Sequence, residues 1–147
     1  METKASPSSP YSVSATWEFR IDKETDIVAV RQQVRKLAKE HQFDQFAVAA
    51  LTTAASELSR NVWVHARSGL ARIMVLRNGK RVGLGLEFVD SGPGIADLNR
   101  VLAGGFSTAK SLVLGLSGTK RLVDEFNIET APGRGTKVVI LKWKRDF

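Results

Sequence analysis

The strongest constraint on the fold is an Asn78-Gly79 pair that separates two segments typical of β-strands, residues 71–77 and residues 81–90. An Asn-Gly pair favours the two-residue turn of a β-hairpin, because such a turn needs residues that tolerate a positive φ. The sequence therefore predicts an antiparallel pair of strands in the middle of the chain, and the other elements must pack around this pair.

The segments that precede the hairpin show clear hydrophobic periodicities. Alternation over residues 12–21 predicts a half-buried strand. Its inward side is predicted to carry Val13, Ala15, Trp17, Phe19 and Ile21. Residues 25–40 and 44–65 place apolar side chains three and four positions apart, which predicts two amphipathic helices, the second with Asp44 as its N-cap.

The C-terminal third alternates between loop signals and short elements. We predict a short helix near residues 97–102, a helix over 119–126, and a final strand pair over 127–131 and 136–144. The remainder of residues 91–118 is rich in Gly and Ser and is predicted to be a loop. Because helices lie between an early strand and a late group of strands, the fold class is predicted to be α+β, a two-layer α/β sandwich.

The composition is that of an ordinary globular chain of 147 residues, the size of one domain. Residues 1–11 are small, polar and Pro/Ser-rich, so we expect a flexible tail there and a single domain over residues 12–147. The absence of cysteine excludes disulfides, thiol nucleophiles and cysteine-ligated zinc. No apolar signal segment or membrane-length apolar run is present, so we expect a cytoplasmic protein without a membrane partner.

The net charge of +7 is unevenly distributed along the chain. Residues 1–66 sum to zero, so residues 67–147 carry all of it. A basic half indicates nucleic acid, nucleotide phosphates or an acidic protein as a partner. No recognised nucleic-acid motif accompanies the basic residues around the hairpin, so we do not expect nucleic acid as the partner.

Glu57 and Asn61 stand four residues apart on the second predicted helix, so their side chains share a face beside the apolar Leu58. A carboxylate and an amide close to a buried face need polar partners. A hard cation such as Mg²⁺ is one partner, which an Asn oxygen can ligate, while Glu57 can accept a proton from an attacking hydroxyl. The alternative is an ordinary solvated helix face.

Asp90 ends the second strand of the hairpin and is followed by Ser91-Gly92-Pro93-Gly94. It has the same parity as Leu86 and Phe88, so its carboxylate is expected to point to the apolar side of the strand. There it can accept a hydrogen bond from a purine amino group, while the glycines allow the backbone to approach a flat ring. The alternative is a turn-forming Asp at the end of a strand.

Two glycine-rich segments complete the candidate site. Residues 104–118 offer backbone N–H groups and a following helix N-terminus to phosphates, with Lys110 adding positive charge. Gly133-Arg134-Gly135-Thr136 opens the last strand. Taken separately, the first segment is equally consistent with a flexible surface loop and the second with a small hairpin loop.

Together these segments resemble the GHKL, or Bergerat, family of ATP-binding domains over roughly residues 12–145. The family's motifs are matched in order by Glu57-x-x-x-Asn61, Asp90-x-Gly92-x-Gly94, Gly115-Leu116-x-Gly118 and Gly133-x-Gly135-Thr136. The resemblance implies ATP and Mg²⁺ as cofactors. It implies that Asn61 holds the metal, that Asp90 and Thr136 read adenine, and that Glu57 acts on the attacking hydroxyl. The other nucleotide-binding positions it implies are Gly92, Gly94, Ser107, Thr108, Lys110, Gly115, Leu116 and Gly118.

A narrower resemblance comes from the strings TAASELSRN at residues 53–61, GGFST at 104–108 and KRLVDEF at 120–126. They are similar to the T-type serine/threonine kinases of regulator-of-sigma-B systems, the switch kinases of bacterial stressosomes. This implies a kinase that phosphorylates STAS-domain scaffold or antagonist proteins and activates a PP2C-type phosphatase once released. Anti-sigma factors share the fold, so an anti-sigma factor that binds a sigma factor, or a non-catalytic binding module, is the alternative.

The lid segment departs from the glycine-rich pattern of these kinases. Lys110, Ser111 and Val113 stand where glycines are expected. A Cβ at Val113 is expected to hinder a positive φ or a close approach of phosphate. We expect residues 104–117 to form a lid that becomes ordered only when phosphates are bound.

Overall fold

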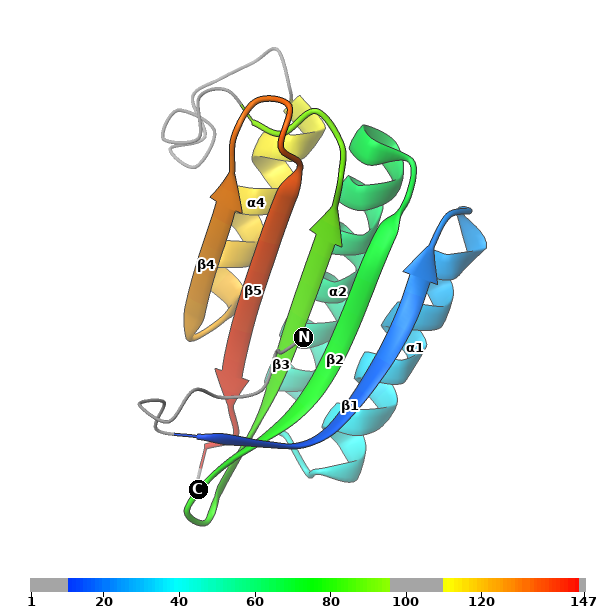
Figure 1. The fold of residues 1–147 in the computed structure, drawn as a ribbon. Helices are drawn as coiled ribbons and strands as arrows, with labels where there is room; N and C mark the ends of the chain where they lie inside the picture. The colour runs from blue at the N-terminus through cyan, green and yellow to red at the C-terminus, as the bar shows by residue number, and fades with distance from the viewer. Residues whose placement is uncertain (1–10, 96–109, 146–147) are drawn as a thin grey trace.

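The computed structural model describes residues 11–95 and 110–145. Five antiparallel strands form one sheet in the order β1-β2-β3-β5-β4. The helices α1, α2 and α4 all cover the same face of this sheet (Figure 1). The predicted α+β two-layer architecture is therefore confirmed.

The described elements follow the predicted order along the chain. Their bounds are β1 (Ser12–Ile21), α1 (Thr25–Glu40), α2 (Gln45–Asn61), η1, a π-helical turn (Val62–Ala66), β2 (Gly69–Asn78), β3 (Arg81–Asp90), α4 (Lys110–Leu122), β4 (Glu125–Thr130) and β5 (Thr136–Trp143). Asp44 caps α2 as predicted, because its Oδ1 accepts a hydrogen bond from the backbone N–H of Ala47 at 2.9 Å. The apolar stripes predicted for the first two helices are buried: Ile27, Val30, Val34 and Leu37 on α1, and Leu51, Ala55, Leu58 and Val62 on α2 and η1.

The predicted hairpin is confirmed, with its turn displaced by one residue. Asn78 pairs with Arg81, so the two turn residues are Gly79 and Lys80. Gly79 has a φ of +61°, a conformation that glycine adopts without the steric cost of a Cβ. The pairing of β2 and β3 continues to Gly69 and Asp90, which brings the end of β3 next to the end of η1.

One side-chain direction predicted for β1 is wrong. Ala15, Trp17 and Phe19 pack on the helix-covered face of the sheet, but Val13 packs with Met74 and Leu76 in the second apolar cluster. The register of β1 against β2 shifts between Val13 and Ala15, and this irregularity sends Val13 to the other face.

The helix predicted over residues 119–126 is also wrong in its position. The α4 helix occupies Lys110–Leu122, so the predicted loop at 104–118 is helical from Lys110 onward, and Glu125 and Phe126 belong to β4. A helical backbone has a negative φ, so the expected need for glycine at Val113 on grounds of positive φ does not apply. The predicted short helix near 97–102 and the rest of the lid lie outside the described residues.

The face of the sheet away from the helices has an apolar part and a charged part. The apolar cluster is centred on Met74, Leu76, Leu141 and Trp143. Beside it, the Arg72 guanidinium contacts Glu18 at 2.6 Å and the buried Glu87 at 2.7 Å, and Lys137 contacts Glu87 at 3.3 Å. These cross-strand pairs neutralise a carboxylate that would be expensive to bury alone.

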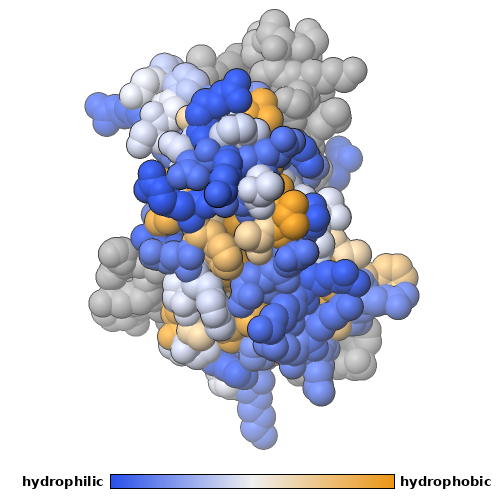
Figure 2. Space-filling model, turned by 90° about the vertical axis from the view of Figure 1, so that its right-hand side faces the viewer, coloured by the Kyte–Doolittle hydropathy of each residue, from blue (hydrophilic) through white to orange (hydrophobic). Residues whose placement is uncertain are grey.

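Figure 2 views the molecule from the side of β1 and α1, where hydrophilic side chains cover most of the surface and hydrophobic patches lie between them. No helix in the described ranges 11–95 and 110–145 has the length and apolar character needed to span a membrane.

Candidate nucleotide site

A cavity of about 210 Å³ lies between the end of α2, the end of β3, the start of β5, and α4. Most of its lining is apolar, and four polar side chains face it, from Asn61, His65, Asp90 and Thr136. The full lining is Leu58, Asn61, Val62, His65, Ala66, Phe88, Asp90, Pro93, Gly94, Ile95, Leu116, Thr136 and Val138. An apolar cavity with a few convergent polar groups is typical of a small-molecule site.

Asp90 supplies the carboxylate of the cavity, on the same side of β3 as Phe88, as its parity predicts. Its Oδ1 accepts a hydrogen bond from the backbone N–H of Gly92 at 2.9 Å. Burial raises the pKa of Asp90, while hydrogen bonds from the backbone of Gly92 and Thr136 and the nearby His65 oppose that rise. A carboxylate has about four acceptor positions, so it can still accept from the amino group of a ligand.

The glycines beside Asp90 are required by contacts between two loops. A Cβ on Gly94 would lie 2.0 Å from the carbonyl oxygen of Ala131, and a Cβ on Gly135 would lie 2.1 Å from that of Asp90. Both glycines also have a positive φ, +74° and +76°. The two loops are joined further by the Gly133 N–H, which donates to the Pro93 carbonyl at 2.7 Å. These glycines therefore allow the two loops of the cavity wall to pack closely against each other. From the sequence alone, we expect them only to let the backbone approach the purine ring of a ligand.

Thr136 is oriented by a short hydrogen-bond chain behind the cavity. The Thr130 hydroxyl donates to the carbonyl of Gly135 and accepts from the backbone N–H of Ile95, both at 2.9 Å. Because that hydroxyl has one hydrogen, the 2.9 Å contact between the Thr130 and Thr136 hydroxyls has Thr136 as its donor. The lone pairs of Thr136 are therefore available to accept a hydrogen bond from a ligand in the cavity.

Asn61 and His65 reach the cavity from the last turn of α2 and from η1. The Nδ2 atom of Asn61 is buried and has no hydrogen-bond partner among the described residues. A buried N–H group without a partner costs free energy unless a ligand supplies the missing hydrogen bond. Rotation of the amide by half a turn would place its oxygen, instead of its nitrogen, toward the cavity. The donor set of the cavity therefore fits a nucleotide with Mg²⁺, with Asn61 as the side chain that would hold the metal. Burial lowers the pKa of His65, and the Asp90 carboxylate opposes that shift.

The structure brings together only part of the predicted site. Asn61, Asp90, Gly94, Leu116 and Thr136 line the cavity, and a Cβ on Gly92 would lie 2.6 Å from Ala66 in its wall.

Other predicted residues lie elsewhere. Glu57 is half-buried on α2, one turn before Asn61, and does not line the cavity. Gly118 is exposed in the middle of α4, with nothing within 4 Å of a Cβ built on it. Lys110 and Gly115 are helical positions of α4, whereas Ser107 and Thr108 lie outside the described residues.

Sequence reasoning missed most of the apolar lining and one polar residue. His65 is not among the residues predicted for the site, yet it lines the cavity. Its position four residues after Asn61 was an available signal, because this spacing places both on one helix face. The sequence gives no comparable signal for Val62 and Val138, because an apolar residue that lines a cavity cannot be told from one that fills the core.

Comparison with known proteins agrees with this geometry. The model of the histidine kinase-like ATPase domain family matches residues 19–143, and the chain belongs to this family. The serine/threonine-protein kinase RsbT of Bacillus subtilis (strain 168) is 44% identical over 126 residues, which are 86% of this chain and 95% of that protein.

Two anti-sigma F factors are more distant relatives. Those of a Thermoanaerobacter species (strain X514) and of Caldanaerobacter subterraneus are each 28% identical over 65% of this chain and 70% of their own length. These matches confirm the resemblance to the GHKL family and to the T-type kinases that the motifs indicate. The predicted enzyme class, a protein serine/threonine kinase, is that of the Bacillus relative.

Proposed function

We propose that this protein is a serine/threonine protein kinase that uses Mg-ATP to phosphorylate STAS-domain proteins in a cytoplasmic stress-signalling partner switch of a bacterium. After release from these proteins it activates a PP2C-type phosphatase. The observation that carries the proposal is the convergence in one apolar cavity of the Asp90 carboxylate and the Asn61 amide, whose buried Nδ2 has no hydrogen-bond partner among the described residues. The similarity to a serine/threonine-protein kinase over nearly its full length supports the same activity.

Each polar residue of the cavity has a distinct role in the proposal. Asp90 accepts from the exocyclic amino group of adenine, and the Thr136 hydroxyl accepts a hydrogen bond beside it. Asn61 holds Mg²⁺, which neutralises phosphate charge during phosphoryl transfer. Glu57, one turn earlier on α2, orients or deprotonates the acceptor hydroxyl of the partner protein.

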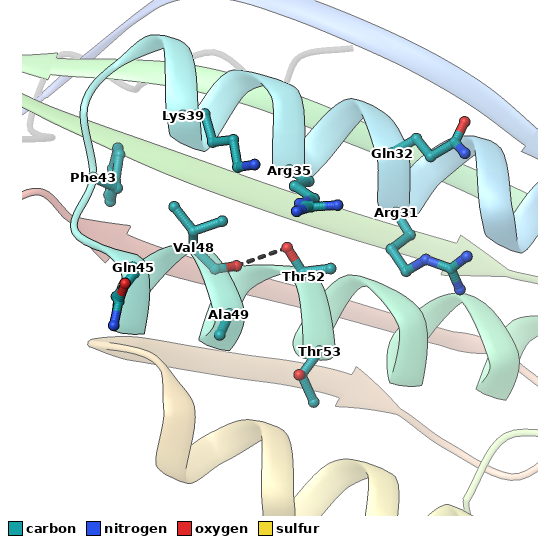
Figure 3. A pocket seen from close by; sticks show the side chains of 10 residues that line it. All are labelled: Arg31, Gln32, Arg35, Lys39, Phe43, Gln45, Val48, Ala49, Thr52 and Thr53. Atoms are coloured by element: carbon teal, nitrogen blue, oxygen red, sulfur yellow. Dashed lines mark hydrogen bonds between the residues drawn. The ribbon is translucent and has the colours of Figure 1, made fainter.

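A groove between α1 and α2 supports a protein as the substrate. It encloses about 730 Å³, and Arg31, Arg35 and Lys39 extend from α1 toward α2 along it (Figure 3). Thr52 and Thr53 lie on the α2 side, where the Thr52 hydroxyl donates to the carbonyl of Val48 at 2.7 Å. The described residues that line this groove include no carboxylate. Three cations that form no ion pair within the described residues favour an acidic protein surface as the ligand.

The second candidate function is an anti-sigma factor or another non-catalytic binding module. The similarity to two anti-sigma F factors favours it. In that case the cavity binds nucleotide weakly or not at all, and the groove between α1 and α2 serves to bind a sigma factor or a phosphatase.

One experiment separates the two functions. The protein is incubated with labelled ATP, Mg²⁺ and a STAS-domain protein of its host, and both label transfer and complex formation are measured. We expect transfer with the wild type and none with Asn61→Ala. The matched control is Asn127→Ala, because Asn127 is an exposed amide on β4. A stable complex without transfer would support the binding module, and equal transfer by Asn61→Ala would contradict the role of Asn61.

A further inference from the structure

Phe46, in the first turn of α2, is the most exposed of the large hydrophobic side chains that the structure describes, at 81%. It borders a hollow of about 370 Å³, where the start of α2, the end of α4 and the end of β5 meet. We call this hollow the Phe46 surface, and its lining is Asp44, Phe46, Ala47, Ala50, Arg121, Leu122, Lys142, Trp143 and Arg145. An aromatic side chain left in water forgoes the free energy of burial, so its exposure beside a hollow lined in part by the apolar Ala47, Ala50 and Leu122 indicates a site of contact with another molecule.

The charged side chains that line the Phe46 surface are three cations and one carboxylate. Arg121, Lys142 and Arg145 line it, and none of the three forms an ion pair within residues 11–95 and 110–145. Among the described residues, Asp44 is the one carboxylate in the lining, and its Oδ1 already accepts from the N–H of Ala47 at the N-terminus of α2. A ligand with negative charge would therefore meet three cations that have no ion-pair partner in the described part of the chain.

We propose that the Phe46 surface docks an acidic segment of a partner protein. The segment places a large apolar side chain against Phe46 and its carboxylates against Arg121, Lys142 and Arg145. Such a combination of an aromatic anchor and complementary charge is common in protein interfaces. The surface is separate from the nucleotide cavity, because α2 has 17 residues and spans about 25 Å between them. The proposal therefore does not depend on ATP binding.

A protein segment fits this surface better than single-stranded nucleic acid. Nucleic acid would need a series of free aromatic faces for its bases. Trp143 is buried, with the Tyr11 ring packed edge-on at 5.9 Å and the Arg81 guanidinium 5.2 Å from its centroid. Among the residues that the structure describes, Phe46 is then the one aromatic face left in the hollow, and its neighbours Ala47, Ala50 and Leu122 suit an aliphatic side chain.

The first test identifies what contacts the surface. A Phe46→p-benzoylphenylalanine variant is cross-linked by light in the cells that produce the protein, and the linked segment is sequenced. The control position is Val64, an apolar side chain that is 44% exposed in η1, at the opposite end of α2. We expect an acidic segment that contains a large apolar residue, linked from position 46 and not from position 64. A nucleic acid, a basic segment, or no product beyond the control would overturn the proposal.

The second test measures the contribution of the surface to binding. A fluorescent peptide with the sequence of the linked segment is titrated with the full chain. We expect Phe46→Ser and, separately, the pair Arg121→Glu and Arg145→Glu to weaken binding about tenfold or more. Val64→Ser and Arg20→Glu, which lie outside this surface and outside the groove between α1 and α2, should change binding less than about twofold. Equal binding of the peptide by all variants would overturn the proposal. Nucleotide binding by Phe46→Ser is measured separately, so that a failure of the proposed kinase site can be distinguished from a failure of this surface.

Discussion

The two ends of α2 illustrate two ways in which a fold builds a binding surface. At its C-terminal end, Asn61 and η1 meet Asp90 and Thr136 around a cavity whose walls depend on backbone contacts at Gly94 and Gly135. At its N-terminal end, Phe46 meets cations from α4 and from the end of β5 on an open surface.

The difference lies in what each surface demands of the backbone. The cavity needs glycines with a positive φ and loops in close contact, so the corresponding positions carry a recognisable pattern. The Phe46 surface needs only side chains of the right type on elements that the fold brings together. Such a surface therefore leaves no motif in the sequence.

The largest expected effect is at the cavity end, for Gly135→Ala. The added Cβ would lie 2.1 Å from the carbonyl oxygen of Asp90, on a backbone with a φ of +76°. We expect a loss of about 3 kcal/mol or more in the free energy of unfolding, because strain and a steric clash add. The control is Gly133→Ala, since Gly133 has a φ of +75° with nothing within 4 Å of a Cβ. The free energy of unfolding of Gly133→Ala should fall by about 1–2 kcal/mol. Urea denaturation measures both, and equal losses would show that the contact with Asp90 is not rigid.

Asp90→Asn should weaken ATP binding by about 1.5–3 kcal/mol, the usual value of a hydrogen bond to a charged group. The change replaces one acceptor oxygen of the carboxylate by a donor that opposes the adenine amino group. Calorimetric titration with ATP and GTP measures the effect. Equal weakening for both nucleotides would contradict a role of Asp90 in reading adenine.

His65 should make the stability of the protein depend on pH. Its pKa is lowered in the folded state, mainly by burial, so folding favours the neutral ring. Stability from this residue is then complete above the ordinary pKa of 6.5 and is lost as the pH falls through the lowered value. The ring is half-buried, and solvent screening limits the effect to below about 1 kcal/mol.

The measurement compares the urea midpoints of the wild type and His65→Gln at pH 7.5 and pH 5. The difference between the two proteins removes the contributions of other titrating groups. We expect it to shift in favour of the Gln variant at the lower pH. A constant difference would show that His65 titrates alike in the folded and unfolded chains.

The smallest effect is expected at the N-terminal end of α2. Phe46→Ser should change the free energy of unfolding by no more than about 0.5 kcal/mol, because the ring is 81% exposed. Leu51→Ala, on the buried stripe of the same helix, should cost about 2–5 kcal/mol. Thermal or urea denaturation compares them, and a large loss for Phe46→Ser would mean that the ring stabilises the fold itself.

The sequence by itself determined the features that depend on local rules. The period of apolar residues predicts α1 and α2, and Asp44 caps α2 as its side chain and position indicate. Strand parity places Asp90 on the side of Phe88, because successive side chains of a strand point to opposite faces. The glycine motifs indicate an ATP-binding domain, and two of their glycines, Gly94 and Gly135, have a positive φ that few other residues adopt.

Only the tertiary structure decided the features that depend on contacts between distant segments. Packing that no local pattern records decides the place of β5 between β3 and β4, the direction of the Val13 side chain, and the end of α4 at Leu122. The same is true of His65 facing Asp90, and of Phe46 beside Arg121 and Lys142. Local sequence sets the periodicity and backbone freedom of each element, whereas the burial of apolar area selects among the arrangements that those elements allow.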